Sequence, residues 1–455
     1  MLKLLFLTSI FYYFPFIDSI TLNRALLESW LPTYNEDTSF QLSHKQIDSI
    51  DTGTFIGLYN LSTLYLNNNQ LARLNVSLLF SGLINLNILQ LGSNQLEYID
   101  AFTFVNLNNL ERLILNMNRL KSLGSFTFRG LQRLSELNLA HNELADLEPS
   151  LFEHLINLNT LKLDHNQLVS LNSFQNLTSL TYLDLSFNRI TFVESFESLL
   201  NLRFLSLSQN QLTNCDFIQN LTNLEYLKLD FNNLSDWSMS SHSNILSRLV
   251  NLKEVYLSSN TISLLNEMAF SNLSNLQRLS LNQNHLKRLY TLTFNNLANL
   301  KWLDLSANEL DYVDPNLFSS LLNLNYLNLA QNRLFSLGDA SIFQNIAKSI
   351  ALIDLSQNQL NEIIFSTFAD LPSLIALDLG FNQLSVLNGD TFKNSQKLEV
   401  LRLNSNRLTS VNSFVFLNMT NLKEVHLFSN PISSYQPVKC KLLCTVKNTN
   451  CTVYL

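Results

Sequence analysis

Leucine and asparagine recur at fixed spacing in an eleven-residue phrase, LxxLxLxxNxL, that is repeated along most of the chain. One copy is formed by Leu134, Leu137, Leu139, Asn142 and Leu144. Most copies follow one another at a step of 24 residues, and all steps fall between 22 and 28 residues. A repeat of this length predicts a solenoid of stacked coils. The sixteen asparagines of the phrase are Asn69, Asn94, Asn118, Asn142, Asn166, Asn188, Asn210, Asn232, Asn260, Asn284, Asn308, Asn332, Asn358, Asn382, Asn406 and Asn430.

The LxL segment of each phrase predicts a short β-strand. Its two leucines point to one face and the residues beside them point to the other, so one face is buried and one is free. The copies should therefore stack into a parallel sheet, with irregular chain and short helical turns on the opposite side. Each asparagine amide can donate and accept at once, and it should satisfy backbone groups of neighbouring coils. An opening copy has Lys45 in place of the asparagine, which an end coil with a single neighbour tolerates.

Two further columns of apolar residues predict the rest of the core. One lies five residues after each asparagine and runs from Leu74 and Ile99 to Val411. Cys215 and Trp237 also fall on this column, and Cys215 is predicted to be a buried free thiol. The other column is aromatic and should stack inside the convex wall. Its members are Phe55, Phe80, Phe104, Phe128, Phe152, Phe174, Phe196, Phe217, Phe270, Phe294, Phe318, Phe343, Phe368, Phe392 and Phe416.

These phrases resemble those of the leucine-rich repeat family over residues 40–432, about 17 coils. The 24-residue coils are similar to those of extracellular members, whereas the 22-residue steps from Asn166 to Asn232 resemble a shorter subclass. The resemblance implies an α/β solenoid, a horseshoe with a parallel β-sheet on its concave face and mostly irregular or short helical turns on its convex face. It also implies that the protein binds other molecules.

Both ends of the array are predicted to be capped. Residues 20–39 should form an N-terminal cap, with a short amphipathic helix over residues 22–31. Residues 433–455 should form a C-terminal cap, where the resemblance to exported members implies one disulfide among Cys440, Cys444 and Cys451. Three pairings are open, and the third thiol could stay idle or link two chains into a homodimer.

Residues 1–19 have the features of a signal peptide. Lys3 precedes an apolar run over residues 4–17, and the small residue Ser19 offers a cleavage site. The run is shorter than the roughly 20 residues of a membrane span, although a signal anchor is an alternative. No second run of spanning length follows, so the chain is predicted to be secreted.

Eight N-glycosylation sequons agree with export. Four of them are simply the NL(S/T) that the convex turn of the repeat produces, so their number alone proves little. The sequons are at Asn60, Asn75, Asn176, Asn220, Asn233, Asn272, Asn418 and Asn450.

Composition narrows the class of partner. A hydrophobic fraction of 46% with 14% charged residues is typical of a packed array and not of a disordered chain. The net charge of −7 and the lack of a basic stripe argue against a nucleic-acid binder. A protein or glycoconjugate ligand is therefore the expected partner.

The free face of the strands is where binding is expected. Tyr182, Phe204 and Tyr226 precede the LxL pair in three successive coils. Because neighbouring strands lie about 4.8 Å apart, these side chains should form one aromatic row. Aromatic residues flanked by charges are typical of interface hot spots, although tyrosine and aspartate are also common at these positions of ordinary repeats. The predicted ligand-binding residues are Tyr182, Phe204, Tyr226, Asp184, Lys228, Asp230, Tyr256, Trp302, Asp304 and Tyr326. A polar insert over residues 235–244 is a second candidate contact site.

Catalysis has little support in the sequence. The HExxH, GxSxG and GxxxxGK motifs are absent, and only nine glycines are present. His141 and His165 occupy equivalent positions in adjacent coils with Asp164 nearby, a set that could hold a metal. Because a repeat brings any residue type into register with its neighbour, we predict no metal site, no cofactor and no enzymatic activity.

The sequence thus predicts an exported binding module with a receptor-like, adhesion or matrix role, which holds its ligand on the concave face. An intracellular scaffold or phosphatase-type regulator is the alternative, and the 22-residue coils suggest it. Signal processing and glycan occupancy separate these two hypotheses.

Overall fold

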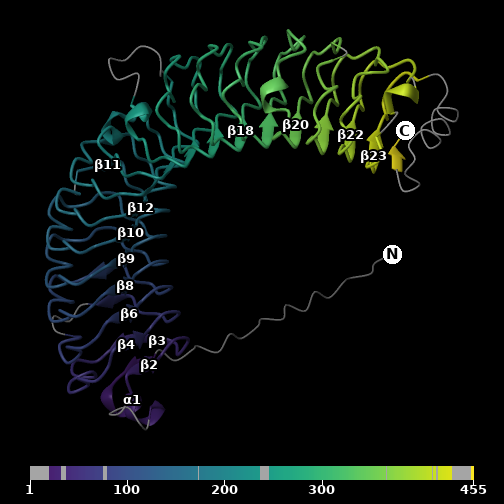
Figure 1. The fold of residues 1–455 in the computed structure, drawn as a ribbon. Coiled ribbons are helices and arrows are strands. Elements are labelled where there is room, and N and C mark those ends of the chain that lie inside the picture. Colours follow the sequence, from purple (N-terminus) through teal and green to yellow (C-terminus); the bar gives the residue numbers. More distant parts are fainter. Residues whose placement is uncertain are drawn as a thin grey trace, which may run out of the picture. The chain divides into compact units, whose positions relative to one another are not determined.

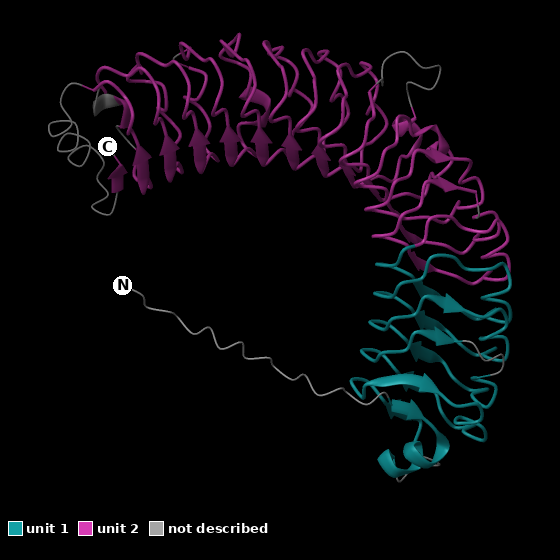
Figure 2. Ribbon diagram, turned by 180° about the vertical axis from the view of Figure 1, so that it is seen from behind, with its two compact units in different colours: residues 1–143 teal, residues 144–455 magenta. Residues whose placement is uncertain are grey.

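The structure, a computed structural model, describes residues 20–31, 37–74, 79–172, 174–235, 245–364, 366–411, 413–416, 419–432 and 452–454. Contacts within the chain divide it into two compact units, Met1–Glu143 and Leu144–Leu455 (Figure 2). Among the described residues, no helix has the length and hydrophobicity that crossing a bilayer requires. The predicted signal peptide, the cysteines at 440, 444 and 451, Trp237 and nearly all of the polar insert lie outside the described residues.

The LxL segments are parallel strands, as predicted, and within each unit every such strand pairs in register with the next one along the chain. Their central residues, such as Leu183 and Leu205, are fully buried. In the first unit the strands are β2 (Ser39–Gln41), β4 (Thr63–Tyr65), β6 (Ile88–Gln90), β8 (Arg112–Ile114) and β9 (Glu136–Asn138). In the second unit they are β10 (Thr160–Lys162), β12 (Tyr182–Asp184), β14 (Phe204–Ser206), β15 (Tyr226–Lys228), β16 (Glu254–Tyr256), β17 (Arg278–Ser280), β18 (Trp302–Asp304), β19 (Tyr326–Asn328), β20 (Leu352–Asp354), β21 (Ala376–Asp378), β22 (Val400–Arg402), β23 (Glu424–His426) and β24 (Thr452–Tyr454) (Figure 1).

The side of each coil away from the sheet is mostly turns. Among the described residues, two short parallel pairs occur there, β5 (Arg73–Leu74) with β7 (Tyr98–Ile99) and β11 (Ser170–Leu171) with β13 (Phe192–Val193). The same described part of the chain has four short 3-10 helices, η1 (Asp216–Ile218), η2 (Leu246–Arg248), η3 (Gln344–Ile346) and η4 (Ser413–Phe416).

The N-terminal cap contains the expected helix, α1 (Arg24–Trp30), with Asn23 as its N-cap. It is preceded by β1 (Ile20–Leu22), which pairs in parallel with β3 (Ile47–Ile50). The ammonium of Lys45 lies 5.4 Å from the centroid of the Trp30 ring. The cation that replaces asparagine in the opening coil is thus accommodated by the cap helix.

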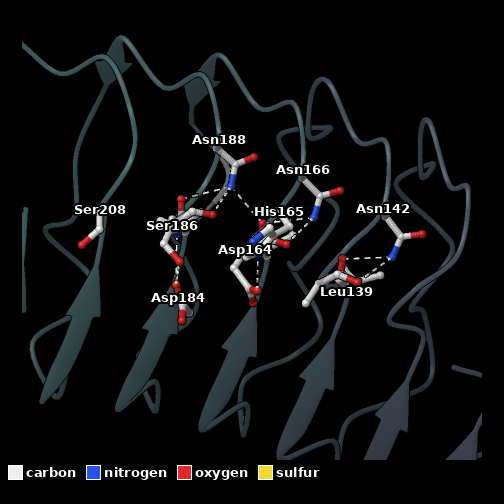
Figure 3. A network of polar contacts seen from close by, with 12 residues as sticks. Leu139, Asn142, Asp164, His165, Asn166, Asp184, Ser186, Asn188 and Ser208 are labelled. Carbon is white, nitrogen blue, oxygen red and sulfur yellow. Dashed lines mark hydrogen bonds and ion pairs between the residues drawn. The ribbon is translucent and has the colours of Figure 1, made fainter. Parts of the chain in front are cut away.

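The asparagine ladder is confirmed. Asn188 Nδ2 donates to the carbonyl oxygens of Leu163 and Leu185, at 3.0 Å each, and its Oδ1 accepts from the Leu168 backbone N–H at 3.0 Å. Figure 3 shows the amides of Asn166 and Asn188 directed at the backbone in this way. Fifteen of the sixteen asparagines are buried, and Asn232, which lies close to the polar insert, is half-buried.

A second ladder of asparagines, which the sequence analysis missed, lies nine residues before the first. Each side chain is exposed, except for the half-buried Asn109, and donates Nδ2 to a backbone carbonyl of the preceding coil, as Asn201 does to Thr178 at 2.8 Å. The members with this bond are Asn85, Asn109, Asn201, Asn223, Asn251, Asn275, Asn299, Asn323 and Asn421.

The residue directly before every ladder asparagine adopts the left-handed conformation, with φ between 51° and 59°. None of the sixteen is glycine, although this conformation costs an ordinary residue roughly 1–2 kcal/mol. The ladder bonds that follow hold the backbone in place. Side chains at this position, such as Phe187 and Phe231, are exposed.

The aromatic column is confirmed with one correction. Phe55 stacks on Phe80 with ring centroids 6.0 Å apart, and the other described members are buried in the same way. Phe217 was predicted as a member and is only half-buried, because Ile218 fills the buried position in its coil. In the two other 22-residue coils the buried phenylalanines, Phe174 and Phe196, stand eight residues after the ladder asparagine, whereas Phe217 stands seven residues after Asn210 and Ile218 stands eight.

Candidate functional site

The predicted aromatic row is formed on the free face of the sheet in the second unit. Tyr182, Phe204 and Tyr226 are paired in register on β12, β14 and β15. The rings of Tyr182 and Phe204 are parallel with centroids 4.3 Å apart, and those of Phe204 and Tyr226 are tilted by 38° at 6.5 Å. All three side chains are half-buried, so each ring is held by its neighbours and keeps one part open to solvent.

Lysine side chains lie over these rings. Lys162 Nζ is 6.0 Å from the Tyr182 centroid, and Lys228 Nζ is 5.5 Å from Phe204 and 5.7 Å from Tyr256. Contacts of this kind are favourable by about 0.5–1 kcal/mol at exposed sites. They also set positive charge beside the apolar surface.

A second aromatic edge, absent from the predicted site, lies at the other end of the same strands. Phe187 and Phe231 precede the ladder asparagines in left-handed conformation and are 44% and 50% exposed. Phe187 stacks on His165 with centroids 4.1 Å apart, and His165 Nδ1 lies 3.0 Å from Asp164 (Figure 3). The residue before the ladder asparagine is variable in the repeat, so the sequence pattern does not indicate where its side chain points. The positive φ of Phe187 and Phe231 shows that both side chains project outward.

A polar strip lies between the two aromatic edges, and Asp184 has a structural role in it. Its Oδ1 accepts from the backbone N–H of Ser186 at 3.0 Å and from the Ser186 hydroxyl at 2.6 Å. Asp304 makes the same pair of bonds with Ser306. These two aspartates therefore close the end of their own strands, whatever else they bind.

Burial raises the pKa of the Asp230 carboxyl, while hydrogen bonds from Ser258 and Ser208 oppose the rise. The Ser258 backbone N–H donates to Asp230 at 3.0 Å and the Ser208 hydroxyl at 3.3 Å. Burial, aided by the nearby Asp184 charge, raises the pKa of Tyr182 to about 12. Burial and a 2.6 Å bond to Glu254 raise the pKa of Tyr256 to about 12. Both phenols are neutral donors at physiological pH.

The remaining predicted residues form a separate group. Trp302 and Tyr326 stack at 5.3 Å with an interplanar angle of 6°, and the Arg278 guanidinium lies 5.0 Å from the Trp302 centroid. Glu254 and Arg278 occupy the equivalent place on the two intervening strands, so the aromatic row is interrupted there. The sequence placed all ten residues on one face correctly, but the structure gathers them around two aromatic centres.

Five sequon asparagines fall within the described residues, and all five side chains are exposed. They are Asn60, Asn176, Asn220, Asn233 and Asn272. None of these five lies on a strand of the main sheet. Asn75, Asn418 and Asn450 lie outside the described residues.

A family model described as Leucine rich repeat matches residues 108–168, 132–190, 169–212, 274–334 and 376–432, and a second, described as Leucine Rich repeats (2 copies), matches residues 200–242. Together these matches cover more than half of the chain. No curated protein sequence matches it.

Several solved structures are similar to this one. A leucine-rich repeat protein of Leptospira interrogans is 25% identical with a TM-score of 0.76, covering 96% of this chain and 100% of that one. The Toll chain of the Drosophila Toll–Spatzle complex is 25% identical with a TM-score of 0.75, covering 91% of this chain and 56% of that one. The ectodomain of the Arabidopsis thaliana receptor kinase GASSHO1/SCHENGEN3, in complex with CASPARIAN STRIP INTEGRITY FACTOR 2, is 26% identical with a TM-score of 0.60, covering 84% of this chain and 50% of that one.

Proposed function

The chain belongs to the leucine-rich repeat family, and we propose that it is an exported binding protein that holds a protein partner on the free face of strands β12 to β16. The face offers Tyr182, Phe204 and Tyr226 as apolar anchors, with Lys228 and Asp230 beside them. Binding, and not catalysis, is the proposed activity.

The observation that carries the proposal is the stacked aromatic row itself. Three adjacent aromatic side chains that keep part of their rings open to solvent in the described structure are uncommon on a protein surface, and such clusters mark interaction sites. The rings are already ordered by stacking and by the lysines above them. A partner that docks on them therefore loses little of its binding energy to ordering this surface.

The similar structures support a protein ligand. Toll is described in complex with Spatzle, and the plant receptor ectodomain is described in complex with CASPARIAN STRIP INTEGRITY FACTOR 2. Both are long chains of which this protein spans about half. The likeness concerns the solenoid, and the partner of this protein must be identified directly.

The first described strand is compatible with export. Leu22 in β1 is fully buried, and its carbonyl accepts the Asp51 backbone N–H at 2.8 Å. Cleavage after Ser19 would leave β1 whole, whereas cleavage a few residues later would remove it. The five exposed sequons away from the sheet are the positions where glycans would leave the proposed binding face uncovered.

The test is capture of partners from extracellular fluid with the glycosylated chain, followed by affinity measurement for each captured protein. The triple variant Y182A/F204A/Y226A should bind about tenfold more weakly or worse, because hot-spot aromatics dominate interface energy. The control is Y98A/F192A/Y312A, which removes three exposed aromatics that lie outside the main sheet.

Unchanged affinity in a folded triple variant would refute the site. Retention of residues 1–19 in cells, together with capture of cytosolic proteins alone, would instead favour the intracellular scaffold. Circular dichroism and urea unfolding of both triple variants establish that any loss comes from the surface and not from unfolding.

A further inference from the structure

An apolar surface lies on the free face of strands β20, β21 and β22 in the second unit (Figure 1). Leu352, Ala376 and Val400 are paired in register on these strands, and Ile375 directly precedes β21. Leu352 and Ile375 are 37% and 40% exposed, whereas Ala376 and Val400 are half-buried. The strands from β10 to β19 carry threonine, aromatic or charged residues at the position of Leu352, so the aliphatic surface begins at β20.

Phe381 extends this surface beyond the carboxyl end of β21. It has the left-handed conformation, with φ of 54°, and is 55% exposed. The residue before it is Gly380, which leaves no side chain between Phe381 and Asp378 along the free face. The β20–β22 surface thus consists of Leu352, Ile375, Ala376, Val400 and Phe381.

Two carboxylates lie within the apolar surface. Asp354 on β20 and Asp378 on β21 are paired in register, and both are half-buried. Like charges directly opposite each other on neighbouring strands are destabilising. Burial raises the pKa of the Asp378 carboxyl and the Asp354 charge adds to the rise, while hydrogen bonds from Gly380 and Arg402 oppose it. The chain therefore compensates this pair of charges only in part.

Asp378 is already bonded on both oxygens, whereas Asp354 is not. Asp378 Oδ1 accepts from the Gly380 backbone N–H at 2.9 Å, and its Oδ2 lies 3.4 Å from the Arg402 guanidinium. Asp354 Oδ1 accepts from the Ser356 backbone N–H at 2.9 Å. Among the described residues, Asp354 Oδ2 accepts no hydrogen bond and no lysine or arginine lies within ion-pair distance of it. Strands β19 to β21 and the residue directly before each of them include no basic residue.

Apolar contact and negative charge together define the partner that fits this surface. A neutral apolar segment would bury the Asp354 carboxylate without a compensating cation, which is unfavourable. Nucleic acid or an anionic membrane surface would bring further negative charge to the same place. A guanidinium or ammonium group bonds strongly to a carboxylate, so a polypeptide with a cation among apolar side chains satisfies both parts. We propose that the β20–β22 surface docks a segment of a protein partner in which apolar side chains flank an arginine or lysine, and that this cation bonds to Asp354.

The β20–β22 surface is separate from the aromatic row, because strands β17, β18 and β19 lie between β16 and β20. The inference therefore does not rest on the partner proposed for Tyr182, Phe204 and Tyr226. A variant of either surface should leave binding at the other unchanged.

The experiment selects a library of random phage-displayed peptides on the full glycosylated chain, after depletion on the variant L352S/D354N. Recovered sequences should combine arginine or lysine with apolar residues. A recovered peptide is then titrated by calorimetry against the native chain, beside the same peptide with its basic residues replaced by glutamine. The glutamine peptide should bind at least about tenfold more weakly, because it lacks the charge-assisted bond to Asp354.

Three variants locate the peptide on the chain. L352S/D354N should weaken binding about tenfold or more, since it removes an apolar contact and the carboxylate while asparagine keeps the acceptor for Ser356. L322S/D311N is the matched control, because it removes one exposed leucine and one exposed aspartate that lie outside the main sheet. Both this control and Y182A/F204A/Y226A should bind the peptide as the native chain does. Circular dichroism and urea unfolding show whether each variant is folded.

Several outcomes would overturn the proposal. One is a selection that yields no peptide with a preference for the native chain over folded L352S/D354N. Another is a set of recovered peptides without enrichment of basic residues, or a glutamine peptide that binds equally well. An equal loss in L322S/D311N would mean that the effect is one of net charge, and an equal loss in Y182A/F204A/Y226A would place the peptide on the aromatic row.

Discussion

The rings of Tyr182 and Phe204 lie parallel, with an interplanar angle of 2° and centroids 4.3 Å apart. Stacked pairs of this kind are worth about 0.5–1.5 kcal/mol beyond the area they bury. A double-mutant cycle of Y182A and F204A on the free energy of unfolding should therefore show coupling of that size. The neighbouring pair of Phe204 and Tyr226, tilted at 6.5 Å, should couple more weakly. Additive effects in the first cycle would mean that the row is not pre-ordered by stacking.

The two asparagine ladders should differ sharply in their contribution to stability. Asn188→Ala leaves the buried Leu168 N–H without its acceptor, whereas the Leu163 and Leu185 carbonyls each keep one ladder donor, from Asn166 and Asn210. A loss of about 1–3 kcal/mol, the cost of one buried unsatisfied group, is therefore expected. Asn201→Ala removes a single exposed bond and should cost about 1 kcal/mol or less, because water replaces the partner. Urea unfolding of the two variants measures the difference. Similar losses would contradict the assignment of the first ladder as the one that fixes the coils.

The aromatic column provides an internal comparison of burial. Phe318 is fully buried, and Phe318→Ala should cost about 3–5 kcal/mol through lost burial and an unfilled cavity. Phe217 is half-buried, so Phe217→Ala should cost clearly less in the same urea unfolding assay. An equal cost at the two positions would mean that Phe217 belongs to the column after all.

Most of the fold could be predicted because the repeat leaves few choices. Once Leu183 and Leu205 face the core, the period of two fixes which residues face outward, and the register of the next strand follows. For that reason the sequence alone placed Tyr182, Phe204 and Tyr226 in one row. The same logic located the cap helix and the buried thiol of Cys215, whose pKa is raised by burial to about 12.

The parts that could not be predicted depend on backbone geometry that the pattern does not encode. Phe187 and Phe231 project beside the row only because the residue before each ladder asparagine is left-handed. The error at Phe217 is different in kind, because its spacing of seven residues from the ladder asparagine, against eight for Phe174 and Phe196, was already readable in the sequence.

Removal of the negative charge of Asp304 should not lower the free energy of unfolding. Its carboxylate accepts from the Ser306 backbone N–H at 2.9 Å and the Ser306 hydroxyl at 2.6 Å. Burial raises its pKa, and the charge of Asp354 adds to the rise. Because the pKa of Asp304 is higher in the folded than in the unfolded state, the protonated carboxyl stabilises the fold. This stabilisation is complete only below the unfolded-state pKa and is lost as pH rises through the folded-state pKa. At neutral pH the ionised carboxylate therefore costs stability.

Asp304→Asn should consequently be at least as stable as the native chain at neutral pH. The amide keeps the acceptor oxygen, and the chain already uses this solution elsewhere, since Asn328 Oδ1 accepts the Ala330 backbone N–H at 3.0 Å. Native and variant proteins should converge in stability at acidic pH, as the pH falls through the raised pKa of the Asp304 carboxyl and the group becomes protonated. Asp304→Ala is the control: it removes charge and acceptor together, leaves the Ser306 N–H without its side-chain partner, and should be less stable than the native chain at both pH values. Urea unfolding at neutral and acidic pH measures the stability of the native chain and both variants. If Asp304→Asn were clearly less stable than the native chain at neutral pH, the ionised carboxylate would be shown to stabilise the coil.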